Sequence, residues 1–169
     1  NTLFLYHGLG TGKTCSDIGV AEEMRNYMKY MGTTKRIIIV ASPNVQENFK
    51  LQLFDETQLK YVNKNWTINN CAGNNLLEDV NILDDGLSRE KVIKIVKNLI
   101  NNFYVFMGYI EFSNLIAKKS NIDDIISVKQ SLTDEEKKFL IKNRLQNFFG
   151  SRLIIIDEIH NIRKSNDKE

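Results

Sequence analysis

Cysteine, histidine and proline are scarce in this sequence of 169 residues, which contains two, two and one of them respectively. Two cysteines, Cys15 and Cys71, exclude the disulfide scaffold of a small secreted domain and make a reducing compartment the default. Only His7 and His160 could join them, and no pair has ligand spacing, so a structural zinc site is disfavoured. We therefore expect Cys15 to be a small packing residue.

Long apolar runs and an excess of one charge are also missing. No segment approaches the roughly 20 apolar residues that a membrane-spanning helix needs, so we expect no membrane partner and an intracellular location. The formal net charge of +2 is too small to indicate nucleic-acid binding by itself. Hydrophobic residues make up 42% of the chain and charged residues 26%, which is typical of a globular protein, and this length predicts one domain.

Short apolar segments alternate with longer helical patterns along the chain. Buried strands are predicted where apolar and β-branched residues follow one another, at 2–6, 36–41, 104–107 and 153–156. The clearest later helices are predicted at 89–101 after Ser88, at 111–118, and from Thr133 to Phe149. This alternation predicts an α/β fold with a mostly parallel sheet and helices on both faces. A weak strand is predicted at 66–71, and a loop or short insert at 120–131.

A glycine-rich segment lies between the first predicted strand and the helix that follows it. Such a loop lets backbone N–H groups converge on phosphate oxygens, and the helix directs its positive end at the same phosphates. Lys13 would contact the β- and γ-phosphates of a triphosphate, and the Thr14 hydroxyl would bind Mg²⁺. The predicted ATP-binding residues are Gly8, Leu9, Gly10, Thr11, Gly12, Lys13 and Thr14. The strict pattern has glycine where this chain has His7, so a chance glycine-rich turn is the alternative.

Two carboxylates, Asp157 and Glu158, follow the last predicted strand directly. Parallel strands end at a common sheet edge, so Asp157 can approach the phosphate loop and its Mg²⁺ despite the long separation in sequence. Glu158 would orient and deprotonate the attacking water. Adjacent strand residues point to opposite faces, so both can serve one site only where the strand ends or bends. The alternative is a solvated turn that caps a helix.

These motifs resemble a known family. The segments HGLGTGKT and DEIH resemble motifs I and II of superfamily 2 helicases of the DExH class, which commonly have a non-glycine residue at the position of His7. The strings GLGTGKT and DEIHNIR resemble the Swi/Snf-related ATPases of large cytoplasmic DNA viruses, including the poxvirus-type early transcription factor ATPase subunit and nucleoside triphosphatase I. ASPNVQENF resembles motif Ia, and YVFMGYIEFSN resembles a segment near motif Ib.

The resemblance implies that residues 1–169 form the first RecA-like lobe of an ATP-dependent motor and end just after motif II, without the second lobe. It implies ATP and Mg²⁺ as ligands, Lys13, Asp157 and Glu158 as catalytic residues, and His160 as a coupling residue. The isolated chain would then hydrolyse ATP poorly. For a viral protein, it implies the host cytoplasm or the virion as location, and the transcription machinery as a partner.

The resemblance also implies contacts with the phosphate backbone of DNA or RNA. The implied residues follow predicted strands and begin helices, and they are Ser42, Pro43, Asn44, Gln46, Gly108 and Tyr109. Free N–H groups at helix starts bind anions, so the chemistry is compatible, and the alternative is ordinary loop and capping chemistry. Such contacts would read the backbone rather than the base sequence.

The leading hypothesis is therefore the ATP-binding lobe of a DNA helicase or translocase that serves viral transcription. One alternative is a P-loop ATPase without a nucleic-acid role. The other is a non-catalytic DNA-binding transcription-factor subunit, against which the intact Lys13, Thr14, Asp157 and Glu158 argue.

Overall fold

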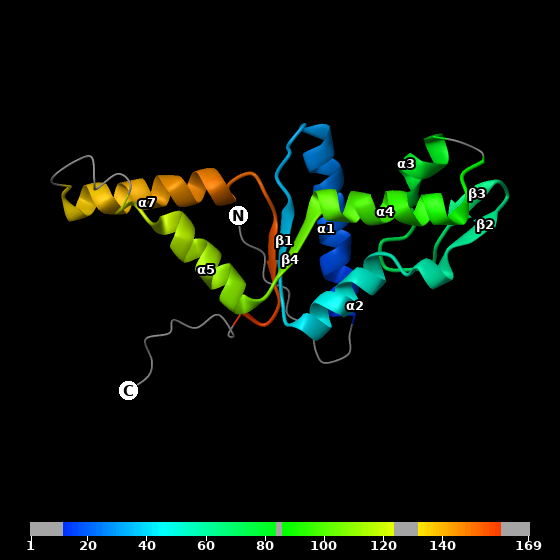
Figure 1. The fold of residues 1–169 in the computed structure, drawn as a ribbon, viewed down its shortest axis with the longest axis horizontal. Coiled ribbons are helices and arrows are strands. Elements are labelled where there is room, and N and C mark those ends of the chain that lie inside the picture. The colour runs from blue at the N-terminus through cyan, green and yellow to red at the C-terminus, as the bar shows by residue number, and fades with distance from the viewer. Residues whose placement is uncertain (1–11, 84–85, 124–131, 160–169) are drawn as a thin grey trace.

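We describe the fold from a computed structural model over residues 12–83, 86–123 and 132–159 (Figure 1). The elements in chain order are α1 (Lys13–Tyr30), β1 (Ile37–Val40), α2 (Pro43–Leu53), the short 3₁₀ helix η1 (Glu56–Gln58), β2 (Lys60–Val62), β3 (Asn65–Thr67), α3 (Asn75–Leu83), α4 (Arg89–Phe103), β4 (Tyr104–Met107), α5 (Tyr109–Ser120), α7 (Asp134–Phe149) and β5 (Ile154–Ile156). The predicted strand at 2–6 lies outside the described residues. Among the described helices, none has the length and apolar character needed to span a membrane.

The central sheet consists of three parallel strands in the order β4-β1-β5. Val40, at the end of β1, lies opposite both Met107 of β4 and Ile156 of β5. All four residues of β1 are buried, as expected of a β-branched strand that is covered on both faces. The three strands end at one common edge. The predicted α/β fold with a parallel sheet is thus confirmed, and it is consistent with a RecA-like lobe.

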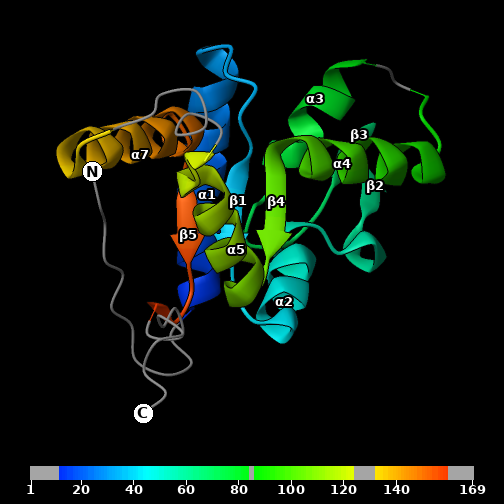
Figure 2. The same cartoon turned by 60° about the vertical axis from the view of Figure 1, so that its left-hand side comes forward.

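Helices cover both faces of this sheet, as predicted. Ile37 and Ile39 of β1 belong to a large core that includes residues of α1, α2, α3 and α4. Ile38 and Val40 belong to a second core, which includes Phe112 of α5. The two cores lie on opposite sides because successive strand residues alternate between faces. Figure 1 shows α5 and α7 on one side of the sheet and α2 and α4 on the other, and in Figure 2 the side with α5 faces the viewer.

Capping residues begin two of the helices where the sequence predicts them. The Ser88 hydroxyl accepts a hydrogen bond from the Lys91 backbone N–H at 3.4 Å and begins α4. Thr133 and Glu136 form a reciprocal capping box at the start of α7. The loop predicted from residue 120 is wrong at its first position, because α5 includes Ser120, and residues 124–131 lie outside the described ones.

The region predicted to contain only a weak strand has more structure. β2 and β3 form an antiparallel hairpin, joined by Asn63 and Lys64 with φ of 50° and 64°. Two consecutive residues with positive φ define a type I′ turn, which favours asparagine first and glycine second, so lysine weakens the signal. The strand ends at Thr67 and not at residue 71, and α3 follows within the same region. The prediction for 66–71 is therefore wrong in its bounds.

A buried ion pair fixes α1 against the sheet. Glu22 and Arg25, each 1% exposed, lie one turn apart on α1. Arg25 Nη2 donates to Glu22 Oε2 at 2.9 Å, and the hydroxyl of Tyr104 on β4 donates to Glu22 Oε1 at 2.5 Å. Burial and the charge of Glu22 both raise the pKa of Tyr104. The network connects α1 to β4 at one edge of the described sheet.

The prediction that Cys15 is only a packing residue is wrong. Cys15 and Cys71 form a disulfide with a Cα–Cα distance of 5.1 Å, which joins the first turn of α1 to the turn before α3. The two residues are 56 positions apart, so their pairing depends on how the tertiary structure packs these segments. A single bond of this kind is compatible with the exclusion of a disulfide scaffold.

Candidate functional site

The candidate site lies at the edge where the three parallel strands end. The Asp157 N–H donates to the Val40 carbonyl at 2.9 Å, and the Ala41 N–H donates to the Met107 carbonyl at 3.2 Å. These two bonds extend the hydrogen-bond ladders of the parallel sheet one residue beyond the strand ends. Residues that follow β1, β4 and β5 are thereby held side by side, at the edge where open α/β sheets bind ligands.

Helix α1 begins at the same edge and carries Lys13 and Thr14 in its first turn. Gly12 precedes it with φ of 81°, a conformation that costs an L-residue roughly 1–2 kcal/mol and so favours glycine. The first turn contains no acidic residue, and Gly12 provides no side-chain cap. The N–H groups of this turn and the positive end of the helix dipole are therefore suited to an anion.

Lys13 lies between the two carboxylates that follow β5. Its Nζ is 2.9 Å from Asp157 Oδ1 and 3.3 Å from Glu158 Oε1, across about 145 positions of sequence. The hydrogen bond with Asp157 raises the pKa of Lys13, and burial opposes it, so the ammonium stays protonated at neutral pH. The structure thus brings together three side chains that the sequence assigned to one site, and their catalytic roles stay predictions.

A bend after β5 lets adjacent residues face the same partner. Glu158 has φ of 48°, in the left-handed region that non-glycine residues rarely adopt. This turn directs the Glu158 carboxylate to the side already occupied by Asp157, which meets the condition that the strand must end or bend. The side chain of Asp157 is 13% exposed and that of Glu158 is 49% exposed.

The donor set fits Mg²⁺ and a triphosphate. Mg²⁺ prefers hard oxygen ligands and is commonly bound by one or two protein groups together with substrate phosphates. The Thr14 hydroxyl and the Asp157 carboxylate are oxygen ligands of this kind, and Lys13 supplies the cation for phosphate. Within the described part of the chain, no group of three or more His, Cys, Asp or Glu side chains could hold a metal. Gly8, Leu9, Gly10, Thr11 and His160 lie outside the described residues.

A hollow of about 580 Å³ lies beside this site, between the starts of α2 and α5. Four of the six predicted nucleic-acid residues line it, namely Ser42, Pro43, Gly108 and Tyr109. Asn44 and Gln46 are not part of its lining, and the Gln46 amide donates to the Ala41 carbonyl at 2.8 Å. The structure therefore brings the two predicted segments together, and nucleic-acid binding stays a prediction.

The helices that begin at this edge differ in capping from α4 and α7. Among the described residues, no side chain at the N-cap position bonds to the starts of α1, α2 or α5, whereas Ser88 and Thr133 cap α4 and α7. These three helices begin at the ligand edge of the sheet. Their first-turn N–H groups are available to water or to an anion.

The charge of the hollow opposes an anion. Glu111 lies in the first turn of α5 and is one of the lining residues. None of the described residues that line the hollow is a lysine or arginine, so a phosphate held by these residues would depend on backbone N–H groups. This balance predicts weaker phosphate binding than a cationic groove would give.

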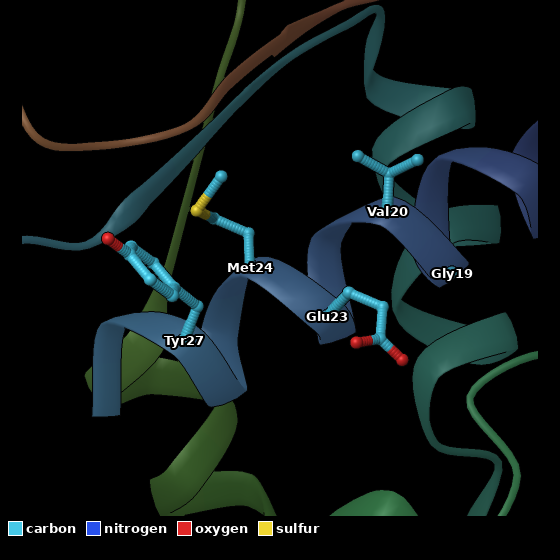
Figure 3. Close-up of a pocket in the computed structure, with 5 residues that line it drawn as sticks. All are labelled: Gly19, Val20, Glu23, Met24 and Tyr27. Carbon is cyan, nitrogen blue, oxygen red and sulfur yellow. The ribbon is translucent and has the colours of Figure 1, made fainter. Parts of the chain in front are cut away.

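A second hollow, of about 430 Å³, lies along α1 (Figure 3). It is lined by Gly19, Val20, Glu23, Met24 and Tyr27, which all belong to that helix. Glu23 is the only acid among them, and none of these residues was predicted to belong to a site. We assign this hollow no function.

Comparisons with known proteins give distant similarity to viral helicases. A candidate ATP-dependent RNA helicase of Acanthamoeba polyphaga mimivirus, L377, is 23% identical over 167 residues, which cover 95% of this chain and 13% of that protein. A candidate helicase of Invertebrate iridescent virus 3, 087L, is 28% identical over 174 residues, which cover 99% of this chain and 14% of that protein. A second candidate ATP-dependent RNA helicase of the same mimivirus, R563, is 27% identical over 166 residues, which cover 95% of this chain and 21% of that protein.

The chain spans about a seventh of the length of the first two curated relatives and about a fifth of the third. No protein-family profile matches it. No solved structure matches it. The similarity extends over nearly the whole chain, so the predicted resemblance to helicases is confirmed at this coarse level.

Proposed function

We propose that the chain is the first RecA-like lobe of an ATP-driven motor of superfamily 2, a helicase or translocase that moves on nucleic acid. The observation that carries the proposal is the position of Lys13, whose Nζ is 2.9 Å from Asp157 Oδ1 and 3.3 Å from Glu158 Oε1. The ammonium and the two carboxylates thus meet at an uncapped helix start on the ligand edge of the sheet, and Thr14 is the next residue of the same helix turn.

The roles follow from the chemistry of each group. Lys13 binds the β- and γ-phosphates of ATP, which compete with the two carboxylates for its Nζ. Glu158, released from Lys13, orients the attacking water and accepts its proton. Thr14 and Asp157 would hold Mg²⁺, which neutralises charge on the phosphate oxygens.

Nucleic acid is proposed to bind at the hollow between α2 and α5. Support comes from the two uncapped helix starts and from the names of the similar proteins, which describe helicases. Contacts through N–H groups read the phosphate backbone, so affinity falls as salt rises. A second lobe in the longer protein closes on ATP and steps along the strand, with His160 coupling the sites. A role in viral transcription, in the host cytoplasm or the virion, belongs to the same proposal.

A second candidate is an ATP hydrolase that does not act on nucleic acid. One observation favours it: among the described residues that line the hollow, Glu111 supplies a carboxylate and none has a basic side chain. In this case Lys13, Asp157 and Glu158 keep their roles, and the segments that contain Ser42 and Gly108 are ordinary helix starts.

The test is ATP hydrolysis by the longer protein that this proposal implies, measured without nucleic acid and with duplex DNA, single-stranded DNA or RNA. Glu158→Gln removes the proposed base and keeps the size of the side chain. Glu23→Gln makes the same change at an exposed position of α1 and serves as the matched control. Binding of a fluorescent ATP analogue is measured for each variant.

We expect Glu158→Gln to bind the analogue and to lose turnover by at least about a hundredfold, the usual size of a general-base contribution. Stimulation of the wild type by nucleic acid supports the motor. A rate of ATP hydrolysis that is the same with and without nucleic acid supports the second candidate. Turnover that survives Glu158→Gln unchanged removes Glu158 as the base, and a protein that neither binds nor hydrolyses ATP refutes both candidates.

A further inference from the structure

Tyr109 connects the hollow to the nucleotide site by one hydrogen bond. Its hydroxyl donates to the backbone carbonyl of Asp157 at 3.0 Å, across 48 positions of sequence. Tyr109 is the first residue of α5, and it lines the hollow beside Ser42 and Pro43. The same side chain packs against the core that contains Val40, so its position depends on both α5 and the sheet.

Asp157 is bound at three points, each from a different part of the fold. Its carboxylate is 2.9 Å from Lys13 Nζ, its N–H donates to Val40, and its carbonyl accepts from Tyr109. The carbonyl belongs to the peptide that joins Asp157 to Glu158. Holding this carbonyl restricts the backbone rotation that places the Glu158 carboxylate.

The backbone conformation of Glu158 depends on the contacts that surround it, so it can change when those contacts change. Its φ of 48° is uncommon for a side chain of this kind and persists only where the surroundings hold it. The Tyr109 hydroxyl is one of the groups that hold the preceding peptide. A ligand that moves the Tyr109 ring therefore changes the support for the turn that contains the proposed base.

From this geometry we infer that Tyr109 is a positioning residue that couples nucleic-acid binding in the hollow to the orientation of the Asp157–Glu158 turn. The inference rests on the proposed function and adds a route between its two sites. A phosphate backbone that binds at the start of α5 shifts the Tyr109 ring. The shift alters the hydrogen bond to Asp157 and thereby the placement of Glu158. Coupling between binding sites is reciprocal, so nucleotide must also change the affinity for nucleic acid.

The test is a thermodynamic cycle on the longer protein. The Kd for a short DNA duplex is measured with and without ATPγS and Mg²⁺, and the ratio of the two values is the coupling factor. Tyr109→Phe keeps the ring and removes only the hydroxyl. Tyr27→Phe makes the same change on an exposed tyrosine of α1 and is the matched control. Thermal unfolding of each variant shows whether the fold is retained.

We expect a wild-type coupling factor that differs from one, and we expect Tyr109→Phe to move it toward one by about two- to tenfold, the effect of a single neutral hydrogen bond. Tyr27→Phe keeps the wild-type factor. A merely structural role for the hydroxyl would change stability and leave the factor as it was. The coupling factor is the ratio of two Kd values measured on the same variant. A substitution that changes both Kd values for the duplex equally, or only the affinity for the nucleotide, therefore leaves the factor unchanged.

Three results overturn the inference. Equal factors in wild type and Tyr109→Phe leave the proposed function intact and remove Tyr109 from the coupling. A wild-type factor of one, with both ligands bound, shows that the sites are independent. A wild type that binds the analogue but neither duplex DNA, single-stranded DNA nor RNA refutes the nucleic-acid part of the proposed function together with this inference.

Discussion

Replacing Glu22 by glutamine is expected to destabilise the fold strongly, although the two side chains have nearly the same size. Arg25 receives its carboxylate contacts from Glu22, with donor–acceptor distances of 3.1, 3.1 and 2.9 Å, and both side chains are 1% exposed. Glutamine keeps one acceptor oxygen but removes the charge. The guanidinium of Arg25 would then be a buried cation without an anion.

The magnitude follows from this burial. Removing one partner of a buried ion pair costs about 3–5 kcal/mol, because the remaining charge stays desolvated. The free energy of unfolding of a typical domain is about 5–15 kcal/mol, so this loss is a large fraction of the total stability. At about 2–4 °C per kcal/mol for a chain of this length, the melting temperature falls by about 6–20 °C.

The assay is urea unfolding followed by circular dichroism, with calorimetry to check two-state behaviour. Lys97→Met is the control, since Lys97 pairs with Glu56 at a surface where the two side chains are 57% and 45% exposed. We expect this control to change the free energy of unfolding by less than about 1 kcal/mol. The triple variant Glu22→Met, Arg25→Met, Tyr104→Phe removes the three polar side chains of the network and leaves the Asn75 carbonyl, which accepts from Arg25 Nη2 at 3.4 Å. It should lie within about 2 kcal/mol of the wild type, because apolar replacements of such pairs are often neutral.

Two results would refute the reasoning. One is a Glu22→Gln variant within about 1 kcal/mol of the wild type, which would mean that water reaches Arg25 in solution. The other is a triple variant as unstable as Glu22→Gln, which would mean that the unpaired charge is not the cause of the loss.

Three further predictions concern stability. Burial and the charge of Glu22 raise the pKa of Tyr104 in the folded state, so its contribution is fully present below the unfolded pKa of about 10 and is lost as the pH rises above it. Tyr104→Phe should therefore flatten the fall in stability between about pH 9 and 11 in urea titrations, and an unchanged slope would contradict this cause. Reduction of the bond between Cys15 and Cys71, followed by thiol counting, should lower the free energy of unfolding by about 2–4 kcal/mol, given the 56-residue separation. Lys64→Gly should raise the free energy of unfolding by about 1 kcal/mol, because φ is 64° at this second turn position. A destabilised glycine variant would mean that the turn has another conformation in solution.

Local sequence signals predicted much of the described fold. The run IIIV at 37–40 forms a buried strand, and the box of Thr133 and Glu136 begins a helix, because both depend on residues near in sequence. The hairpin at 60–67 was missed because Lys64 stands where a type I′ turn favours glycine. Helix α3 was missed as well, since it lies in a segment without a clear periodic pattern.

The sequence by itself determined the order of the sheet strands β1, β4 and β5 and of the helices that flank them, together with the presence of Lys13, Thr14, Asp157 and Glu158. Periodicity, caps and the phosphate-loop pattern are local properties of the chain, so they can be read without coordinates. Parallel topology then limited where the strand ends could meet.

Tertiary structure alone decided how these residues are joined. The contacts of Lys13 with Asp157 and Glu158, the disulfide of Cys15, and the bond from Tyr109 to Asp157 connect segments 48 to 145 positions apart. No local propensity encodes such pairs. They form because packing on the two faces of the sheet fixes the helices relative to the strands, and the side chains at the sheet edge then have only a few neighbours within reach.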